Sequence, residues 1–208
     1  MKVIPLTRGK YTIVDDEDYE RLIQHSWAWV PATGSCSGKG YAVRKGNRKR
    51  GEPRTIQMHR EILNAPKGTF VDHINLDSLD NRKENLRFVN VQQNSFNKAK
   101  PIMDCTSKYK GVFRRKNTQA WTARIKFNNR HVELGTYKDE EKAAAVYNFA
   151  SRLLFGRYRH ENSGVSELTL SEQRGIFERA RRYIEKYGWY VDTNTYRSFF
   201  MEKVSVET

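Results

Sequence analysis

Residues 70–94, FVDHINLDSLDNRKENLRFVNVQQN, combine two short apolar runs with a high density of polar side chains. Phe70 and Val71 lead into Asp72 and His73, and a segment rich in asparagine and charge follows before the second apolar run. A protein core disfavours such groups, because burying them unpaired costs a few kcal/mol each. A solvated loop needs no apolar lead-in, so we expect these side chains to serve a site.

The hydrophobic pattern of this stretch predicts a β-β-α unit, with strands over 70–73 and 86–89 and a helix beginning at Val91. Upstream, residues 1–57 predict a β-rich region with strands over 10–14, 27–30, 41–44 and 55–58. A short helix is expected after Asp15-Asp16, which offers a cap, and another over 59–63. The basic run 44–50 reads either as a solvated loop or as a phosphate contact.

The second half predicts three antiparallel strands, over 109–115, 121–127 and 130–135, with Asn128-Asn129 as a hairpin turn. The middle strand alternates strictly, with its apolar side chains on one face and Thr122, Arg124 and Lys126 on the other. Asp139 is expected to cap a long helix that covers the apolar face. A last amphipathic helix is expected over 169–187, with Leu170, Phe177, Ala180 and Ile184 inside.

These patterns predict an α+β fold: a β-rich region with the β-β-α unit, then a three-stranded sheet with one packed helix, then a C-terminal helix. The expected boundaries are a first domain over 1–98, a linker over 99–106, a second domain over 107–162 and a helical extension over 163–208.

The charge balance points to a polyanionic partner. The 208 residues carry 38 Lys and Arg against 24 Asp and Glu, a formal net charge of +14, and nucleic acid is the first partner to expect. No apolar run of membrane-spanning length and no signal segment is seen in the sequence, so we expect no membrane partner. Cys36 and Cys105 form neither a metal-ligand spacing nor a disulfide framework, and a cytoplasmic, nucleoid-associated protein is the simplest expectation. A zinc site built from both cysteines with His59 and His73 lacks paired spacing.

Asp72 and His73 suit phosphodiester hydrolysis. Histidine can take a proton from water at cellular pH, and a positioned general base contributes about 10²–10⁴-fold in rate. A hard divalent cation needs only one or two protein oxygens, which Asp72 and a downstream asparagine could supply. Adjacent strand residues point to opposite faces, so this arrangement would require a bent or bulged strand end.

These residues resemble the HNH nucleases of phage and intron homing endonucleases. The resemblance is carried by Val71–Ile74, by Leu79–Arg87, by Asn94 and by the preceding Met58-His59-Arg60. It implies a ββα-metal fold with one Mg²⁺ or Mn²⁺ ion, His73 as general base, and Asp72 and Asn94 as metal ligands. Asn85 would tie the connection between the strands together through backbone hydrogen bonds. His59 would support the site or contact DNA, or be a half-buried histidine at a helix start.

Residues 109–162 resemble the plant APETALA/ethylene-response-factor (AP2/ERF) DNA-binding domain, through Tyr109–Val112, Trp121–Ile125, Leu134–Tyr137 and Glu140–Tyr147. That family lays its sheet in the major groove. Phe113 and Glu133 depart from its pattern, so the plant target is not implied. The resemblance places the following side chains on the DNA side: Lys110, Arg115, Arg124, Lys126 and His131. Arg114 and Arg130 are either phosphate contacts or solvated side chains.

The whole sequence therefore predicts a site-directed, metal-dependent DNA endonuclease of homing type, from a phage or other mobile element. We expect double-stranded DNA as partner and no small-molecule cofactor. The oligomeric state is open, with a monomer as one option. The competing hypotheses are a DNA-binding regulator without cleavage activity and a nuclease directed at RNA.

Overall fold

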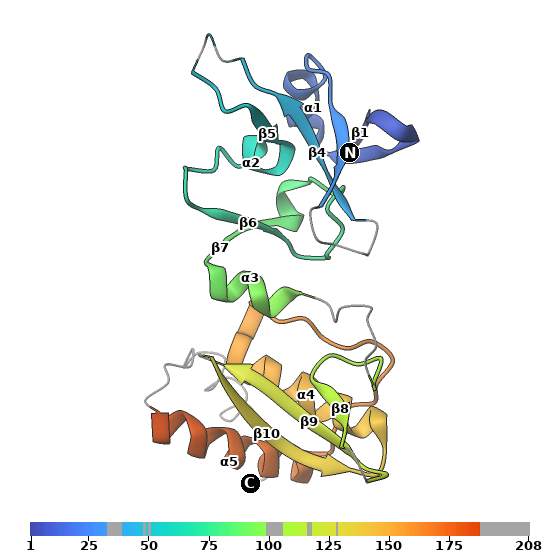
Figure 1. Ribbon diagram of the computed structural model, residues 1–208, viewed down its shortest axis with the longest axis vertical. Coiled ribbons are helices and arrows are strands. Elements are labelled where there is room, and N and C mark those ends of the chain that lie inside the picture. Colours follow the sequence, from blue (N-terminus) through green and yellow to red (C-terminus); the bar gives the residue numbers. More distant parts are fainter. Residues whose placement is uncertain are drawn as a thin grey trace, which may run out of the picture. The chain divides into compact units, whose positions relative to one another are not determined.

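The computed structural model describes residues 1–32, 39–47, 49, 51–98, 106–115, 118–127 and 129–187. The chain divides into two compact units, Met1–Asn97 and Lys98–Thr208. Both combine short antiparallel strands with helices (Figure 1), which confirms the predicted α+β class. Cys36, Cys105, Asn128 and most of the expected linker lie outside the described residues.

The first unit begins with a two-stranded sheet of β1 (Lys2–Pro5) and β2 (Tyr11–Val14), joined by the 3₁₀ turn η1 (Thr7–Gly9). The sequence reading missed β1. Helix α1 (Asp16–Leu22) follows, and Asp15 occupies its N-cap position. Its carboxylate does not cap the helix as expected: it accepts a hydrogen bond from the Lys83 N–H at 2.8 Å.

A second, three-stranded antiparallel sheet has the order β3 (Ala28–Pro31), β4 (Gly40–Lys45), β5 (Thr55–Gln57), and α2 (Met58–Ile62) follows it. The hydrophobic core of this unit joins these elements to β1, β2 and α1, because burying apolar surface is the main favourable term in folding. The buried apolar core residues are Ile4, Leu6, Val14, Leu22, Trp27, Ala42, Met58, Ile62 and Leu86.

The predicted β-β-α unit is present as β6 (Phe70–His73), β7 (Leu86–Val89) and α3 (Val91–Asn97). The two strands are antiparallel in regular register, with Asp72 opposite Arg87 and His73 opposite Leu86. Residues 74–85, here called the crossover loop, connect them and end in the 3₁₀ turn η3 (Lys83–Asn85). The loop is fixed to β2, because Ile13 donates its N–H to Leu79 O at 2.9 Å and accepts from the Asn81 N–H at 2.8 Å.

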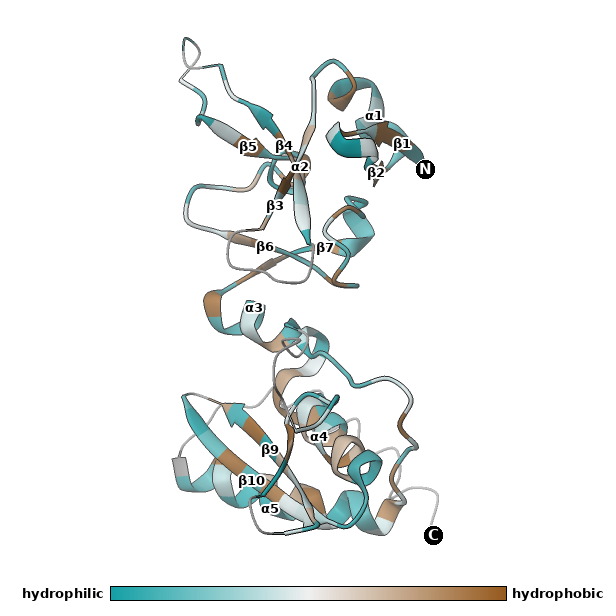
Figure 2. Ribbon diagram, turned by 45° about the vertical axis from the view of Figure 1, so that its right-hand side comes forward, coloured by the Kyte–Doolittle hydropathy of each residue, from teal (hydrophilic) through white to brown (hydrophobic). Residues whose placement is uncertain are grey.

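The second unit has a sheet of order β10 (Arg130–Tyr137), β9 (Trp121–Phe127), β8 (Val112–Arg114). Hydrophobic and hydrophilic positions alternate along β9 and β10 (Figure 2). Helix α4 (Glu140–Phe155) packs on all three strands. It begins as predicted, with the Asp139 side chain accepting a hydrogen bond from the Glu141 N–H at 3.0 Å.

The 3₁₀ turn η4 (Gly156–Tyr158) and helix α5 (Leu170–Tyr187) complete the described part of this unit, and α5 packs against α4 and β10. Leu170 was expected inside but is 47% exposed, while Ile176 is buried. The buried stripe of α5 is set by Ile176, Phe177 and Ala180, and Leu170 lies at the start of the helix, away from the centre of that stripe.

Candidate active site and nucleic-acid interface

His73 ends strand β6 with its side chain buried and its Nε2 atom 3.2 Å from Asn81 Oδ1. The orientation of the Asn81 amide follows from its neighbours. Thr12 Oγ1 donates to Leu79 O at 2.7 Å, so it accepts from Asn81 Nδ2, which lies 2.7 Å away. Asn81 Oδ1 is therefore the atom that faces His73, and the imidazole must donate its Nε2–H. The proton-accepting atom of neutral His73 is then Nδ1.

Burial keeps both histidines of this site neutral. It lowers the pKa of His73 below its ordinary value, partly opposed by the hydrogen bond to Asn81. His59, on α2, is also buried, and its ring centre lies 5.0 Å from that of His73. Burial and the neighbouring His73 lower the pKa of His59 to about 3. The Tyr41 ring packs against both imidazoles: its centre lies 5.4 Å from that of His59 and 6.2 Å from that of His73.

Asp72 is buried beside His73 and holds two partners that the sequence reading missed. Arg87, directly opposite on β7, donates from Nε at 3.0 Å and from Nη2 at 2.8 Å, and Asn97 donates from Nδ2 at 3.0 Å. All three bonds end on Oδ2, and within the described residues no hydrogen bond reaches Oδ1. The cross-strand position of Arg87 was a usable signal, since opposite charges pair across strands.

Asn94 lies on α3, half-buried, and donates its backbone N–H to Asn90 O at 3.0 Å. Among the described residues its side chain forms no hydrogen bond with Asp72; Asn97 does, one turn further along the same helix, and it also donates to His73 O at 2.9 Å. Helix α3 packs against both strands of the unit, and residues three apart share a helix face. The role of Asn94 as a ligand stays a prediction.

The donor set fits a hard divalent cation. Asp72 Oδ1 and the Asn94 amide oxygen are both oxygen donors, and magnesium takes one or two such groups and fills its shell with water and phosphate. No group of three or more His, Cys, Asp or Glu side chains suited to a metal occurs in the described part of the chain. Asp72 and Asn94 as the ligands of one divalent cation stay a prediction.

Asn85 is buried and bridges the crossover loop. Its Oδ1 accepts from the Asn75 N–H at 2.9 Å, and its Nδ2 donates to Asp80 O at 2.8 Å. Asp80 also holds Arg82 through Nε at 2.8 Å and Nη2 at 2.7 Å, and these bonds lower the pKa of the Asp80 carboxyl. The loop after His73 is thus held by several bonds, and Asn85 makes its contacts with the backbone.

In the second unit, three of the residues expected to face DNA lie together on the outer face of the sheet. Lys126 is opposite His131 and Arg124 is opposite Glu133 across β9 and β10, and the Arg124 guanidinium lies 4.5 Å from the centre of the Phe113 ring. Partial burial, Arg124 and Lys126 lower the pKa of His131. Thr122, expected on this exposed face, is instead fully buried and hydrogen-bonds Thr136.

The other expected contacts are placed differently. Arg115 pairs with Glu133, Arg130 is exposed at the start of β10, and the Arg114 guanidinium lies 5.6 Å from the centre of the Trp121 ring. Lys110 precedes β8 and is half-buried, and its amine donates to Lys98 O. Burial and the charge of Lys98 lower the pKa of Lys110 to about 8.

The basic run 44–50 begins with a residue that is already paired. Arg44 donates to Glu61 at 2.7 Å and to Glu52 at 3.1 Å, with its side chain largely buried. It therefore acts within the fold, while Lys45 and Lys49 are exposed.

Comparisons with known proteins find relatives of two kinds, HNH endonucleases and AP2/ERF transcription factors. The sequence profile of the HNH endonuclease family matches residues 64–96. An uncharacterized HNH endonuclease of Acanthamoeba polyphaga mimivirus is 34% identical over 113 residues, 51% of this chain and 57% of that protein.

Two Arabidopsis thaliana transcription factors also match. An ethylene-responsive factor is 30% identical over 119 residues, 56% of this chain and 26% of that protein. An AP2/ERF and B3 domain-containing factor is 40% identical over 76 residues, 36% of this chain and 21% of that protein. The chain thus spans little more than half of the viral relative and about a quarter or less of the plant ones. Together the matches confirm both resemblances: an HNH endonuclease-type segment is joined to an AP2/ERF-type segment.

The helices described here offer no candidate for a transmembrane span, since none combines sufficient length with sufficient apolarity.

Proposed function

We propose that this chain is a divalent-metal-dependent DNA endonuclease of the homing type, whose HNH unit hydrolyses the phosphodiester bond and whose AP2/ERF-like sheet positions the DNA. The observation that carries the proposal is the oriented, neutral imidazole of His73 next to the Asp72 carboxylate. Neutral imidazole is the form that can accept a proton, so the buried His73 is ready to act as a base at cellular pH.

In this mechanism His73 Nδ1 takes a proton from the attacking water, while Nε2–H stays bonded to Asn81. As the imidazole becomes positively charged, Asn81 Oδ1 stabilises it and keeps the ring in place. Asp72 and Asn94 would hold the cation, which when bound supplies charge stabilisation at the phosphate and at the leaving oxygen. Arg87 and Asn97 fix the Asp72 carboxylate, and Asn85 keeps the crossover loop in shape. His59 packs against the base and supports its position.

The sheet of the second unit supplies the DNA contacts. Arg124 and Lys126 place two cations on one face, with His131 opposite Lys126, and Arg–guanine pairs contribute about 1–3 kcal/mol of discrimination each. We assign phosphate contacts to Arg114 and Arg130, whereas Arg115 is held by Glu133. Tethering the small HNH unit to this sheet raises its local concentration at a chosen site.

The test is cleavage of supercoiled plasmid, and of DNA that flanks the gene of this chain, with Mg²⁺ or Mn²⁺. We expect His73→Ala to lose cleavage at least about 100-fold while duplex binding is kept. His25→Ala is the matched control, because His25 is an exposed histidine of the same unit. Normal cutting by His73→Ala would refute the mechanism.

Two further comparisons address the reader and the alternative function. Arg124→Ala should weaken duplex binding or relax its sequence preference, whereas Lys138→Ala, which removes an exposed cation after β10, should not. The transcription-factor relatives favour a regulator as the second candidate. Sequence-specific binding with no cleavage of any DNA, under either metal, would establish that alternative.

A further inference from the structure

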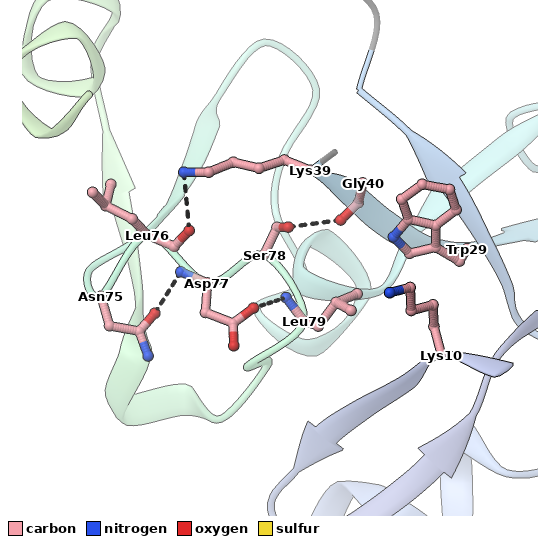
Figure 3. Close-up of a pocket in the computed structure, with 9 residues that line it drawn as sticks. All are labelled: Lys10, Trp29, Lys39, Gly40, Asn75, Leu76, Asp77, Ser78 and Leu79. Carbon is pink, nitrogen blue, oxygen red and sulfur yellow. Dashed lines mark hydrogen bonds between the residues drawn. The ribbon is translucent and has the colours of Figure 1, made fainter. Parts of the chain in front are cut away.

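The first unit contains a groove of about 360 Å³ that none of the roles above uses (Figure 3). One wall is part of the crossover loop, residues 75–79, which begins two positions after His73. The other wall is formed by Lys10, Trp29, Lys39 and Gly40, from the ends of strands β2, β3 and β4. The groove therefore borders the loop that directly follows the proposed general base.

The walls of the groove are held in place by hydrogen bonds. Ser78 Oγ donates to Gly40 O at 2.6 Å, and the Lys39 amine reaches Leu76 O at 3.4 Å (Figure 3). The backbone N–H of Trp29 donates to Thr7 Oγ1 at 3.0 Å. Its indole lies so close to Gly40 that a Cβ there would be 2.4 Å from Trp29 Cε2. These contacts fix the two walls relative to each other, and Gly40 is needed for the shape of the groove.

The groove is cationic. Lys10 and Lys39 are exposed, and Figure 3 shows the Lys10 side chain next to the Trp29 indole. The guanidinium of Arg8 lies 5.4 Å from the centre of the Trp29 ring, which keeps a third cation beside the groove. Asp77 is the opposing carboxylate, and its Oδ1 accepts from the Leu79 N–H at 2.9 Å. Three cations against one anion favour a ligand with repeated negative charge.

We propose that this groove binds the sugar–phosphate backbone of duplex DNA next to the bond that is cut. The inference rests on the proposed function, since that function brings DNA to the crossover loop. Lys10 and Lys39 neutralise phosphates of the bound strand, and Trp29, on the same wall, provides an apolar surface for the sugars. Contacts of this kind fix the register of the duplex without reading its sequence.

The experiment measures the dissociation constant of the full chain for a random-sequence duplex over a series of salt concentrations. The logarithm of the association constant falls linearly with the logarithm of the salt concentration, and each lost phosphate contact makes this negative slope shallower by about 0.9. We expect Lys10→Gln with Lys39→Gln to make the slope shallower by about 1.8 and to weaken binding most at low salt. Lys2→Gln with Lys67→Gln removes the same charge from two exposed lysines outside the groove, and we expect it to leave the slope unchanged.

A third variant removes a negative charge from the groove instead of positive ones. Asp77→Asn keeps the acceptor for the Leu79 N–H but removes the anion from the groove, so we expect tighter binding at low salt. The inference is overturned if the groove pair keeps the wild-type slope, if the control pair loses as much, or if the loss is confined to single-stranded DNA.

The outcomes separate this inference from the nuclease proposal. Cleavage that depends on His73, with no effect of the groove pair on binding or on cutting, would remove the groove and leave the nuclease. A reduced slope in a chain that cuts no DNA would support the groove and remove the nuclease.

Discussion

Acidification should destabilise the first unit through His59. The pKa of His59 is 6.5 in its ordinary state and about 3 in the folded protein, so between these values the unfolded chain binds more protons than the folded one. Stability contributed by the neutral ring is then present above pH 6.5 and is lost as the pH falls. Integrating this difference from pH 7 to pH 5 gives a loss of about 2 kcal/mol in the free energy of unfolding.

The variant His59→Phe isolates this contribution. Phenylalanine is a planar ring that can pack between Tyr41 and His73, as His59 does, and it cannot take up a proton. Because the chain has two compact units, a single unfolding transition is not assured. We therefore choose hydrogen–deuterium exchange of the slowest amides of β4, corrected for intrinsic exchange rates, as the measure of opening free energy.

The expected result is a loss between pH 7 and pH 5 that is about 2 kcal/mol larger in the wild type than in His59→Phe. Carboxylates that titrate in this range affect both proteins alike and cancel in the comparison. Equal losses in the two proteins, or an imidazole titration of His59 near pH 6.5, would show that the ring is not held neutral by burial. The reasoning about His73 would then fail as well, since the same cause lowers its pKa.

Two further changes test how the site is held. Asn85→Ala leaves the Asn75 N–H and the Asp80 carbonyl without their partner. We expect the opening free energy of the crossover-loop amides, measured by hydrogen–deuterium exchange, to fall by about 1–3 kcal/mol, and unchanged exchange of these amides would contradict this. Arg87→Met removes the cation that pairs with the largely buried Asp72 and should lower the free energy of unfolding by about 3 kcal/mol. Mg²⁺ should then raise the melting temperature of Arg87→Met more than that of the wild type, and an equal response would separate Asp72 from metal binding.

Local patterns predicted most of the elements. Strict alternation identified β9 to the residue, and Asp139 marked the start of α4, because strand periodicity and helix capping are encoded within a few neighbouring residues. Strand β1 was missed because only Ile4 of its four residues, Lys-Val-Ile-Pro, is buried, so its strand conformation is set by pairing with β2. Leu170 was misplaced for a related reason, since the buried stripe of α5 is defined by its contacts with α4 and β10.

The contacts within the candidate site could be predicted only in part. Asp72 and His73 stood out because acid and imidazole are adjacent, and the register of two short strands brings Arg87 opposite Asp72. Glu133 was seen as a departure from the AP2/ERF pattern, but its ion pair with Arg115 depends on how β8 and β10 are placed. Lys110 is drawn away from the sheet by the carbonyl of Lys98, a contact between segments that no local pattern relates.

The orientation of the proposed base depends on a residue far outside the motif. His73 and Asn81 lie within residues 64–96, which the HNH profile matches, but Thr12 is 69 positions before Asn81. Without the Thr12 hydroxyl, nothing in this network would decide which end of the Asn81 amide faces the imidazole. A flipped amide would present an N–H to His73 Nε2 and would leave the proton on Nδ1, the atom that must receive one. The hairpin of β1 and β2 is therefore part of the proposed catalytic arrangement, and residues 64–96 alone do not orient the proposed base.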